Sequence, residues 1–128
     1  MTYKYAQETY NVIGAAMEVY NVLGYGFKEE VYQEAMEREL TLRDIPFERQ
    51  KIINIYYKEE RLQRSYQADI VCYDKIIVEL KALPKLSSEC EQQLLNYMKA
   101  TKMEVGMLIN FGSSSGIEHK RMANFFDK

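Results

Sequence analysis

The stretch from residue 47 to residue 81 constrains the fold most, because β-branched and aromatic residues dominate long runs of it. This composition is typical of strands. Three strands are expected, at residues 52–57, 62–73 and 75–81. The links between them are short, and the second is centred on Asp74. Short links join antiparallel neighbours, so the sequence predicts two consecutive β-hairpins.

Helical patterns precede these strands. Residues 5–23 repeat apolar side chains at helical spacing, and Gly24 and Gly26 supply the backbone freedom that a helix end needs. Residues 28–43 predict a second helix, which ends before Pro46 because proline cannot continue a helix. The positions expected to form part of its buried face are Val31, Ala35, Leu40 and Leu42.

Further elements are expected after the strands. A capping box at residues 88–91, in which Ser88 accepts from the Glu91 amide, predicts a third helix that runs to about Lys102. Residues 105–111 are apolar enough for a buried strand, and residues 117–126 predict a closing element of either type. This order predicts an α/β (α+β) fold with a mixed sheet flanked by helices. The 128 residues are expected to form one domain, residues 1–128.

Composition excludes several classes of protein. The N-terminus does not read as a signal peptide, and no apolar run is long enough for a membrane span, so no membrane partner is expected. Cys72 and Cys90 lack metal-type spacing and are expected to be reduced, which indicates a cytoplasmic location. The net charge of -2 argues against binding nucleic acid through a broad positive field. Any such contact would need a local basic patch.

Three charged residues of the second hairpin are the candidates for chemistry. Glu79 and Lys81 are two residues apart on a strand, so their side chains leave the same face. A hairpin that turns at Asp74 places Asp69 roughly opposite Glu79. The chain has one histidine, His119, which lies in a charged run and is expected at the surface. Zinc-histidine clusters are therefore excluded.

Two neighbouring carboxylates repel each other unless they are protonated or neutralised. A divalent cation neutralises them, and oxygen ligands with retained waters suit Mg²⁺ or Mn²⁺. Lys81 beside such a site could orient a water and stabilise developing phosphate charge. The alternative is a cross-strand salt bridge on an exposed face of the sheet, and the spacing alone leaves both interpretations open.

Seven consecutive residues, from Gly26 through Glu29 to Tyr32, read G-x-x-E-x-x-Y. They resemble the signature of the GxxExxY proteins. Further matches to that family are Ala35-Met36, Glu39-Leu40, residues 46–50, Ala68-Asp69, residues 78–82, residues 93–97 and residues 106–112. The resemblance covers about residues 12–121. This family is placed in the PD-(D/E)XK nuclease-like superfamily.

The resemblance implies a restriction-endonuclease-like αβββαβ core with an extra N-terminal helix. It also implies roles for matching residues. Asp69 and Glu79 would be metal ligands, with Glu29 as an additional acid on the first core helix, and Lys81 would be the catalytic lysine. Gln93 and Tyr97 match a Gln-x-x-x-Tyr pattern of nucleases similar to RecB, and Gln93 would belong to the catalytic set. The implied cofactor is Mg²⁺ (or Mn²⁺).

Two functions are therefore expected as alternatives. One is a Mg²⁺-dependent nuclease that hydrolyses phosphodiester bonds of DNA or RNA. The other is a catalytically inactive nuclease-fold module that binds nucleic acid, a protein partner or a second copy of itself. Each of the added residues also has an alternative role. Glu29 could simply stabilise a helix N-terminus through the helix dipole, Gln93 could face solvent, and Tyr32 and Tyr97 could be packing residues. Scattered lysines and arginines could form a basic rim or an ordinary solvated surface.

Overall fold

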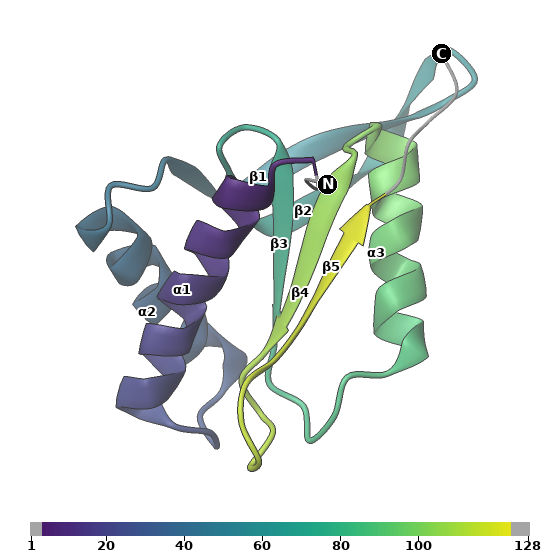
Figure 1. The fold of residues 1–128 in the computed structure, drawn as a ribbon. Coiled ribbons are helices and arrows are strands. Elements are labelled where there is room, and N and C mark those ends of the chain that lie inside the picture. The colour runs from purple at the N-terminus through teal and green to yellow at the C-terminus, as the bar shows by residue number, and fades with distance from the viewer. Residues whose placement is uncertain (1–3, 124–128) are drawn as a thin grey trace.

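The computed structural model describes residues 4–123 (Figure 1). The elements follow the predicted order, with a strand as the closing element. They are α1 (Ala6–Leu23), α2 (Glu29–Leu42), β1 (Phe47–Tyr57), β2 (Glu60–Cys72), β3 (Ile76–Lys81), α3 (Ser88–Thr101), β4 (Val105–Asn110) and β5 (Glu118–Ala123). Residues 124–126 of the predicted closing element lie outside the described residues.

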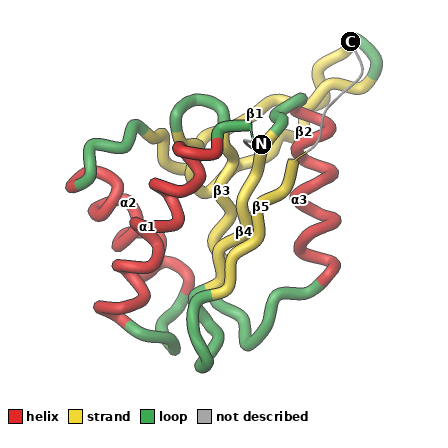
Figure 2. The backbone as a smooth tube through the Cα atoms, viewed as in Figure 1, coloured by secondary structure: helices red, strands yellow, loops and turns green. Residues whose placement is uncertain are grey.

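The strands form one mixed sheet in the order β1-β2-β3-β4-β5 (Figure 2). Both predicted hairpins are confirmed, because β1 with β2 and β2 with β3 pair antiparallel. At the second hairpin Tyr73 and Asp74 have φ of 56° and 63°, and the Lys75 amide donates to the Cys72 carbonyl at 3.1 Å. This is the primed turn that suits the twist of a two-residue hairpin. β3 and β4 are parallel, and α3 makes the crossover between them.

Helices cover both faces of the sheet (Figure 1), so the expected α/β (α+β) architecture is confirmed. On β3, Ile76, Val78 and Leu80 belong to the core that α1 and α2 close. Ile77 belongs to the core under α3 together with Leu94. Successive side chains of β3 point to opposite faces of the sheet. Glu79 and Lys81 are therefore expected on the α3 side, as Ile77 is.

Two details of the helices differ from the prediction. Val31 and Leu42 are exposed, because the buried stripe of α2 runs through Tyr32, Met36 and Leu40 at four-residue steps. The N-cap of α3 is Ser87 instead of Ser88, and its hydroxyl oxygen accepts from the Cys90 amide at 3.3 Å. The two adjacent serines explain the shift by one position, since either could cap the same helix.

None of the helices described has the length and apolar character that crossing a bilayer needs. His119 is exposed on β5, as expected.

Candidate active site

The site lies where β2 and β3 part. Residues 70–72 pair with residues 76–78, and the regular backbone pairing ends there. At the next position Asp69 and Glu79 connect the two strands through their side chains. The Asp69 amide donates to Glu79 Oε2 at 3.2 Å, and Asp69 Oδ2 accepts from the Leu80 amide at 2.8 Å. The predicted placement of Asp69 beside Glu79 is therefore confirmed, and each carboxylate bonds to the backbone of the opposite strand.

Tyr66 is a third residue of this arrangement, which the sequence analysis missed. Its hydroxyl donates to Glu79 Oε2, and only 5% of the residue is exposed. Its ring stacks on Tyr97 of α3, with centroids 3.9 Å apart and planes at 9°. A buried tyrosine hydroxyl needs a polar partner, and Tyr66 lies three residues before Asp69 on the same strand. That combination was the available sequence signal.

Glu29 reaches the same region from the first turn of α2. Much of the side chain is exposed. Desolvation of its carboxylate and the nearby charge of Asp69 raise its pKa, whereas Lys81 and the Ala82 backbone N–H favour the ionised form. The structure therefore places Glu29 within electrostatic reach of both Asp69 and Lys81.

Tyr32 holds the loop that leads to Glu29. Its hydroxyl donates to the Gly24 carbonyl at 2.6 Å and accepts from the Phe27 amide at 3.2 Å. The ring is fully buried and stacks on Phe111, with centroids 4.6 Å apart. Gly26 has φ of 111°, a conformation that side chains rarely adopt. The G-x-x-E-x-x-Y spacing thus joins a glycine turn, an acidic first helical turn and a tyrosine that fixes the turn to the core.

Lys81 is half-buried at the end of β3. No ion pair among residues 4–123 includes it, although its charge favours the ionised forms of Glu29, Asp69 and Glu79. The alternative of a cross-strand salt bridge on an exposed sheet face does not describe this geometry. Its ammonium lies near three carboxylates without being paired to one.

Asn110 holds the segment that follows Lys81 through hydrogen bonds to Leu83. The fully buried Asn110 side chain donates to the Leu83 carbonyl and accepts from the Leu83 amide, both at 2.8 Å. It also accepts from the Gly112 amide at 3.1 Å and donates to Glu118 Oε1 at 2.8 Å. A lone amide residue within an apolar strand is the signal that could have identified it, because a buried polar group needs partners.

Gln93 is not brought to the acids by any contact in the described part of the chain. It is exposed on α3, whose buried face is formed by Leu94 and Met98. Its predicted neighbour in the pattern, Tyr97, reaches the site through its stacking on the ring of Tyr66.

Burial sets the electrostatics of the acid pair. It raises the pKa of Glu79 to about 7, with a further contribution from the charge of Asp69 and opposing hydrogen bonds from Tyr66 and the Asp69 amide. Burial also raises the pKa of Asp69, against the Leu80 amide and Lys81. The desolvated pair therefore favours proton uptake or a cation.

The donor set fits a hydrated hard cation. Glu79 Oε1 and Asp69 Oδ1 accept no hydrogen bond from the residues that the structure describes. Over residues 4–123, no three His, Cys, Asp or Glu side chains group closely enough to hold a metal by themselves. A cation here would have two close protein carboxylates and complete its shell with water, as Mg²⁺ commonly does.

Comparisons with known proteins agree with this fold. The crystal structure of SSO0001 is similar to the chain, with a TM-score of 0.60 and 16% sequence identity. The match covers 77% of this chain and 50% of that one, so the chain spans about half the length of that neighbour. At this identity the likeness shows the fold alone. No curated protein matches the sequence.

The sequence profile of the PD-(D/E)XK nuclease superfamily matches residues 6–122. The matched region begins at the first residue of α1 and ends within β5, so it includes all the acidic residues of the site. The chain therefore belongs to the PD-(D/E)XK nuclease superfamily.

Proposed function

We propose that the protein is a nuclease that hydrolyses phosphodiester bonds of DNA or RNA with Mg²⁺ or Mn²⁺. The observation that carries this proposal is the arrangement of Asp69 and Glu79 at the point where β2 and β3 separate. Asp69 and Glu79 each use one oxygen for backbone hydrogen bonds and keep the other free, with the unpaired Lys81 nearby. Nuclease activity also accords with the superfamily.

In this mechanism Asp69 and Glu79 would hold the cation, and Glu29 would contribute a further acid from α2. The bound cation would neutralise the acids and polarise the scissile phosphate. Lys81 would orient the attacking water and stabilise the negative charge that develops on the phosphate oxygens. The water oxygen forms a bond to phosphorus and gives up a proton to solvent, while the bond to the leaving oxygen breaks and that oxygen takes a proton from solvent. The products are a phosphate monoester and a free hydroxyl group.

Within the superfamily, we place the chain among the GxxExxY proteins. The structural roles of Gly26, Glu29 and Tyr32 support this. Gly26 forms the turn before α2, Glu29 lies near the other acids, and Tyr32 bonds to the Gly24 carbonyl and so holds the turn. We also propose that residues 1–128 form one domain, that nucleic acid is the binding partner, and that the protein acts in the cytoplasm. The contribution of Gln93 to catalysis stays a prediction.

The second candidate is a nuclease-fold module that binds nucleic acid, a protein or a second copy without cleaving. Two observations favour it: the net charge of -2, and the lack of a three-residue ligand group among residues 4–123. The two candidates differ in whether the protein cleaves nucleic acid.

A cleavage panel tests the proposal. Single- and double-stranded DNA and RNA are incubated with the protein in Mg²⁺, Mn²⁺ or EDTA, alongside Asp69→Asn and Asp74→Asn. Asp74 is the matched control, because it lies on the same hairpin with a side chain that is 81% exposed. We expect metal-dependent cleavage by wild type and Asp74→Asn, and none by Asp69→Asn.

Binding without cleavage on every substrate would instead establish the module. Cleavage by Asp69→Asn at the rate of wild type would show that any activity resides elsewhere.

A further inference from the structure

Asp69 lies at an irregular point of the β1–β2 ladder. Arg49 pairs with Ile70 and Lys51 with Ala68, but the intervening pair of Gln50 and Asp69 is missing. Gln50 has φ of 46°, which is outside the strand region. A main chain that lacks regular pairing on both neighbouring strands is less restrained. The Leu80 amide holds the Asp69 carboxylate, whereas the position of the Asp69 main chain depends on side-chain contacts.

Gln33 of α2 supplies one of these contacts. Its Nε2 donates to the Asp69 carbonyl oxygen at 3.0 Å and to Glu37 Oε2 at 2.8 Å. Each of the two amide hydrogens therefore has its own acceptor, and the two hydrogen bonds together fix the orientation of the Gln33 side chain. Gln33 lies four residues after Glu29, and the two side chains therefore share a face of α2.

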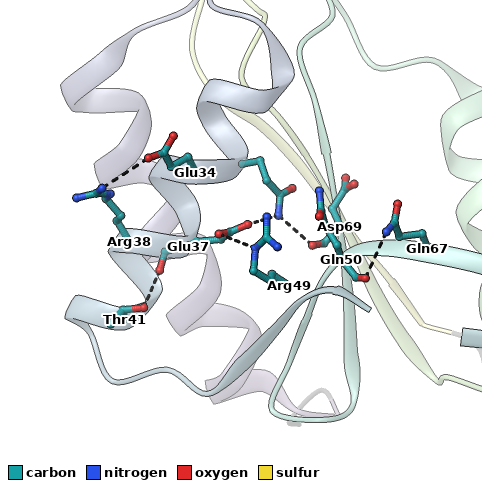
Figure 3. A network of polar contacts seen from close by, with 9 residues as sticks. Glu34, Glu37, Arg38, Thr41, Arg49, Gln50, Gln67 and Asp69 are labelled. Carbon is teal, nitrogen blue, oxygen red and sulfur yellow. Dashed lines mark hydrogen bonds and ion pairs between the residues drawn. The ribbon is translucent and has the colours of Figure 1, made fainter. Parts of the chain in front are cut away.

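Glu37 extends this network to β1 (Figure 3). Its Oε1 accepts from Arg49 Nε at 3.1 Å, and only 18% of the Glu37 side chain is exposed. The network thus joins α2, β1 and the carbonyl of Asp69. It approaches Asp69 from the backbone side, whereas Leu80 and Glu79 contact it from β3.

We propose that Gln33 is a positioning residue, which fixes the peptide plane of Asp69 and so keeps the Asp69 carboxylate aimed at the cation. The inference rests on the proposed function of the site. Gln33 does not contact the cation or the substrate. Its effect is on the orientation of a ligand, and misplacing a ligand by a fraction of an ångström weakens a metal site.

The test replaces Gln33 with methionine, which has a similar length and no donor. Gln92→Met is the matched control, because Gln92 is an exposed glutamine of α3 that donates to Asn96 at 3.0 Å, four residues further on. Arg49→Met removes the far end of the network and leaves the bond from Gln33 to Asp69 in place. Mn²⁺ affinity is measured by titration calorimetry, and kcat and KM are measured on the substrate that wild type cleaves.

We expect Gln33→Met to weaken Mn²⁺ binding or lower kcat by about 10- to 100-fold, as loss of a supporting hydrogen bond typically does. KM for the nucleic acid and the circular dichroism spectrum should stay close to those of wild type. Gln92→Met and Arg49→Met should bind and cleave like wild type.

The inference is overturned if Gln33→Met binds Mn²⁺ and turns over as wild type does, or if it loses only thermal stability. In both cases the proposed function stands. If wild type itself neither binds Mn²⁺ nor cleaves nucleic acid, the proposed function fails and the inference fails with it. Should Gln33→Met not fold, Gln33→Lys is measured in its place, because lysine retains a donor. Mn²⁺ binding as tight as that of wild type would support the inference. A wild-type fold with weak Mn²⁺ binding would overturn it.

Discussion

Glu79→Gln should change how the stability of the metal-free protein depends on pH. Glu79 is half-buried beside Asp69, and desolvation raises the pKa of its carboxylate to about 7 from an ordinary value of 4.5. Between these two pH values the folded protein binds a proton at Glu79 that the unfolded chain does not. The free energy of unfolding therefore falls as pH rises from about 4.5 to about 7.

The size of this fall follows from the two pKa values. At about 1.4 kcal/mol for each pKa unit, the loss amounts to roughly 3 kcal/mol, and it is complete above pH 7. A glutamine keeps an oxygen that accepts from Tyr66 and from the Asp69 amide but has no charge to desolvate. The variant should therefore resemble protonated wild type at pH 5 and be more stable than wild type at pH 8. The raised pKa of Asp69 leaves a smaller pH dependence in both proteins.

Urea unfolding in EDTA at pH 5 and pH 8 measures the effect, and Glu60→Gln, an exposed position at the start of β2, serves as control. Wild type and the control should lose stability between the two pH values, whereas Glu79→Gln should lose less by up to about 3 kcal/mol. Repeating the series with Mn²⁺ should reverse the order of wild type and Glu79→Gln at pH 8, because wild type and the control gain binding energy that Glu79→Gln does not. If Glu79→Gln and wild type lose stability equally, the Glu79 carboxylate is not desolvated as described, and the electrostatic argument for a cation falls.

Three further variants test other parts of the site. Lys81→Ala should keep Mn²⁺ binding and fold but lose cleavage by about 10²–10³-fold, whereas a mere surface ion pair would cost under ~1 kcal/mol and leave turnover unchanged. Tyr66→Phe keeps the ring and removes the donor to Glu79, so the Glu79 pKa measured by carboxyl carbon NMR should rise further, and an unchanged pKa would refute this contact. Gly112→Ala would place a Cβ 2.4 Å from the Leu83 nitrogen, and should lower the free energy of unfolding by about 1–3 kcal/mol in chemical denaturation. Wild-type stability in this variant would show that the backbone around Leu83 can shift to accommodate the added Cβ at little cost.

The pairing of Asp69 with Glu79 was predictable because it depends on local pattern. The short link at Asp74 sets the register of the hairpin, and a register fixes which residues face each other along both strands. Alternation then assigns Glu79 and Lys81 to one face. That step needs nothing beyond residues 62–81.

Other residues of the site were not predictable from periodicity. Asn110 bonds across 27 residues and Gln33 across 36, and each bonds to a backbone group that is left free where a regular ladder ends or is interrupted. Tyr66 bonds across only 13 residues, but its partner is the Glu79 carboxylate, and hydrophobic patterning does not indicate a contact between two polar groups. Hydrophobic patterning predicts where strands lie, but it does not indicate where two strands diverge.

The orientation of α3 illustrates the same limit. Gly106 brings β4 close under the helix, since a Cβ there would lie 2.8 Å from Met98 Sδ and 3.2 Å from a methyl carbon of Leu94. This packing turns Leu94 and Met98 inward and leaves Gln93 exposed. The four-residue spacing predicted that Gln93 and Tyr97 share a helix side, yet only Tyr97 reaches the site region, through the ring of Tyr66.

The hydrogen bonds of the acid pair link the stability of the fold to its chemistry. Asp69 and Glu79 connect β2 to β3 where the backbone pairing ends, so they extend the contact between the two strands beyond the ladder. The same contacts bury their charges, which costs free energy whenever the site is empty and ionised. A divalent cation offsets that cost through the two oxygens that the backbone leaves free. Stability would thus depend on metal most strongly above pH 7, where Glu79 is ionised and a proton on it no longer substitutes for the cation.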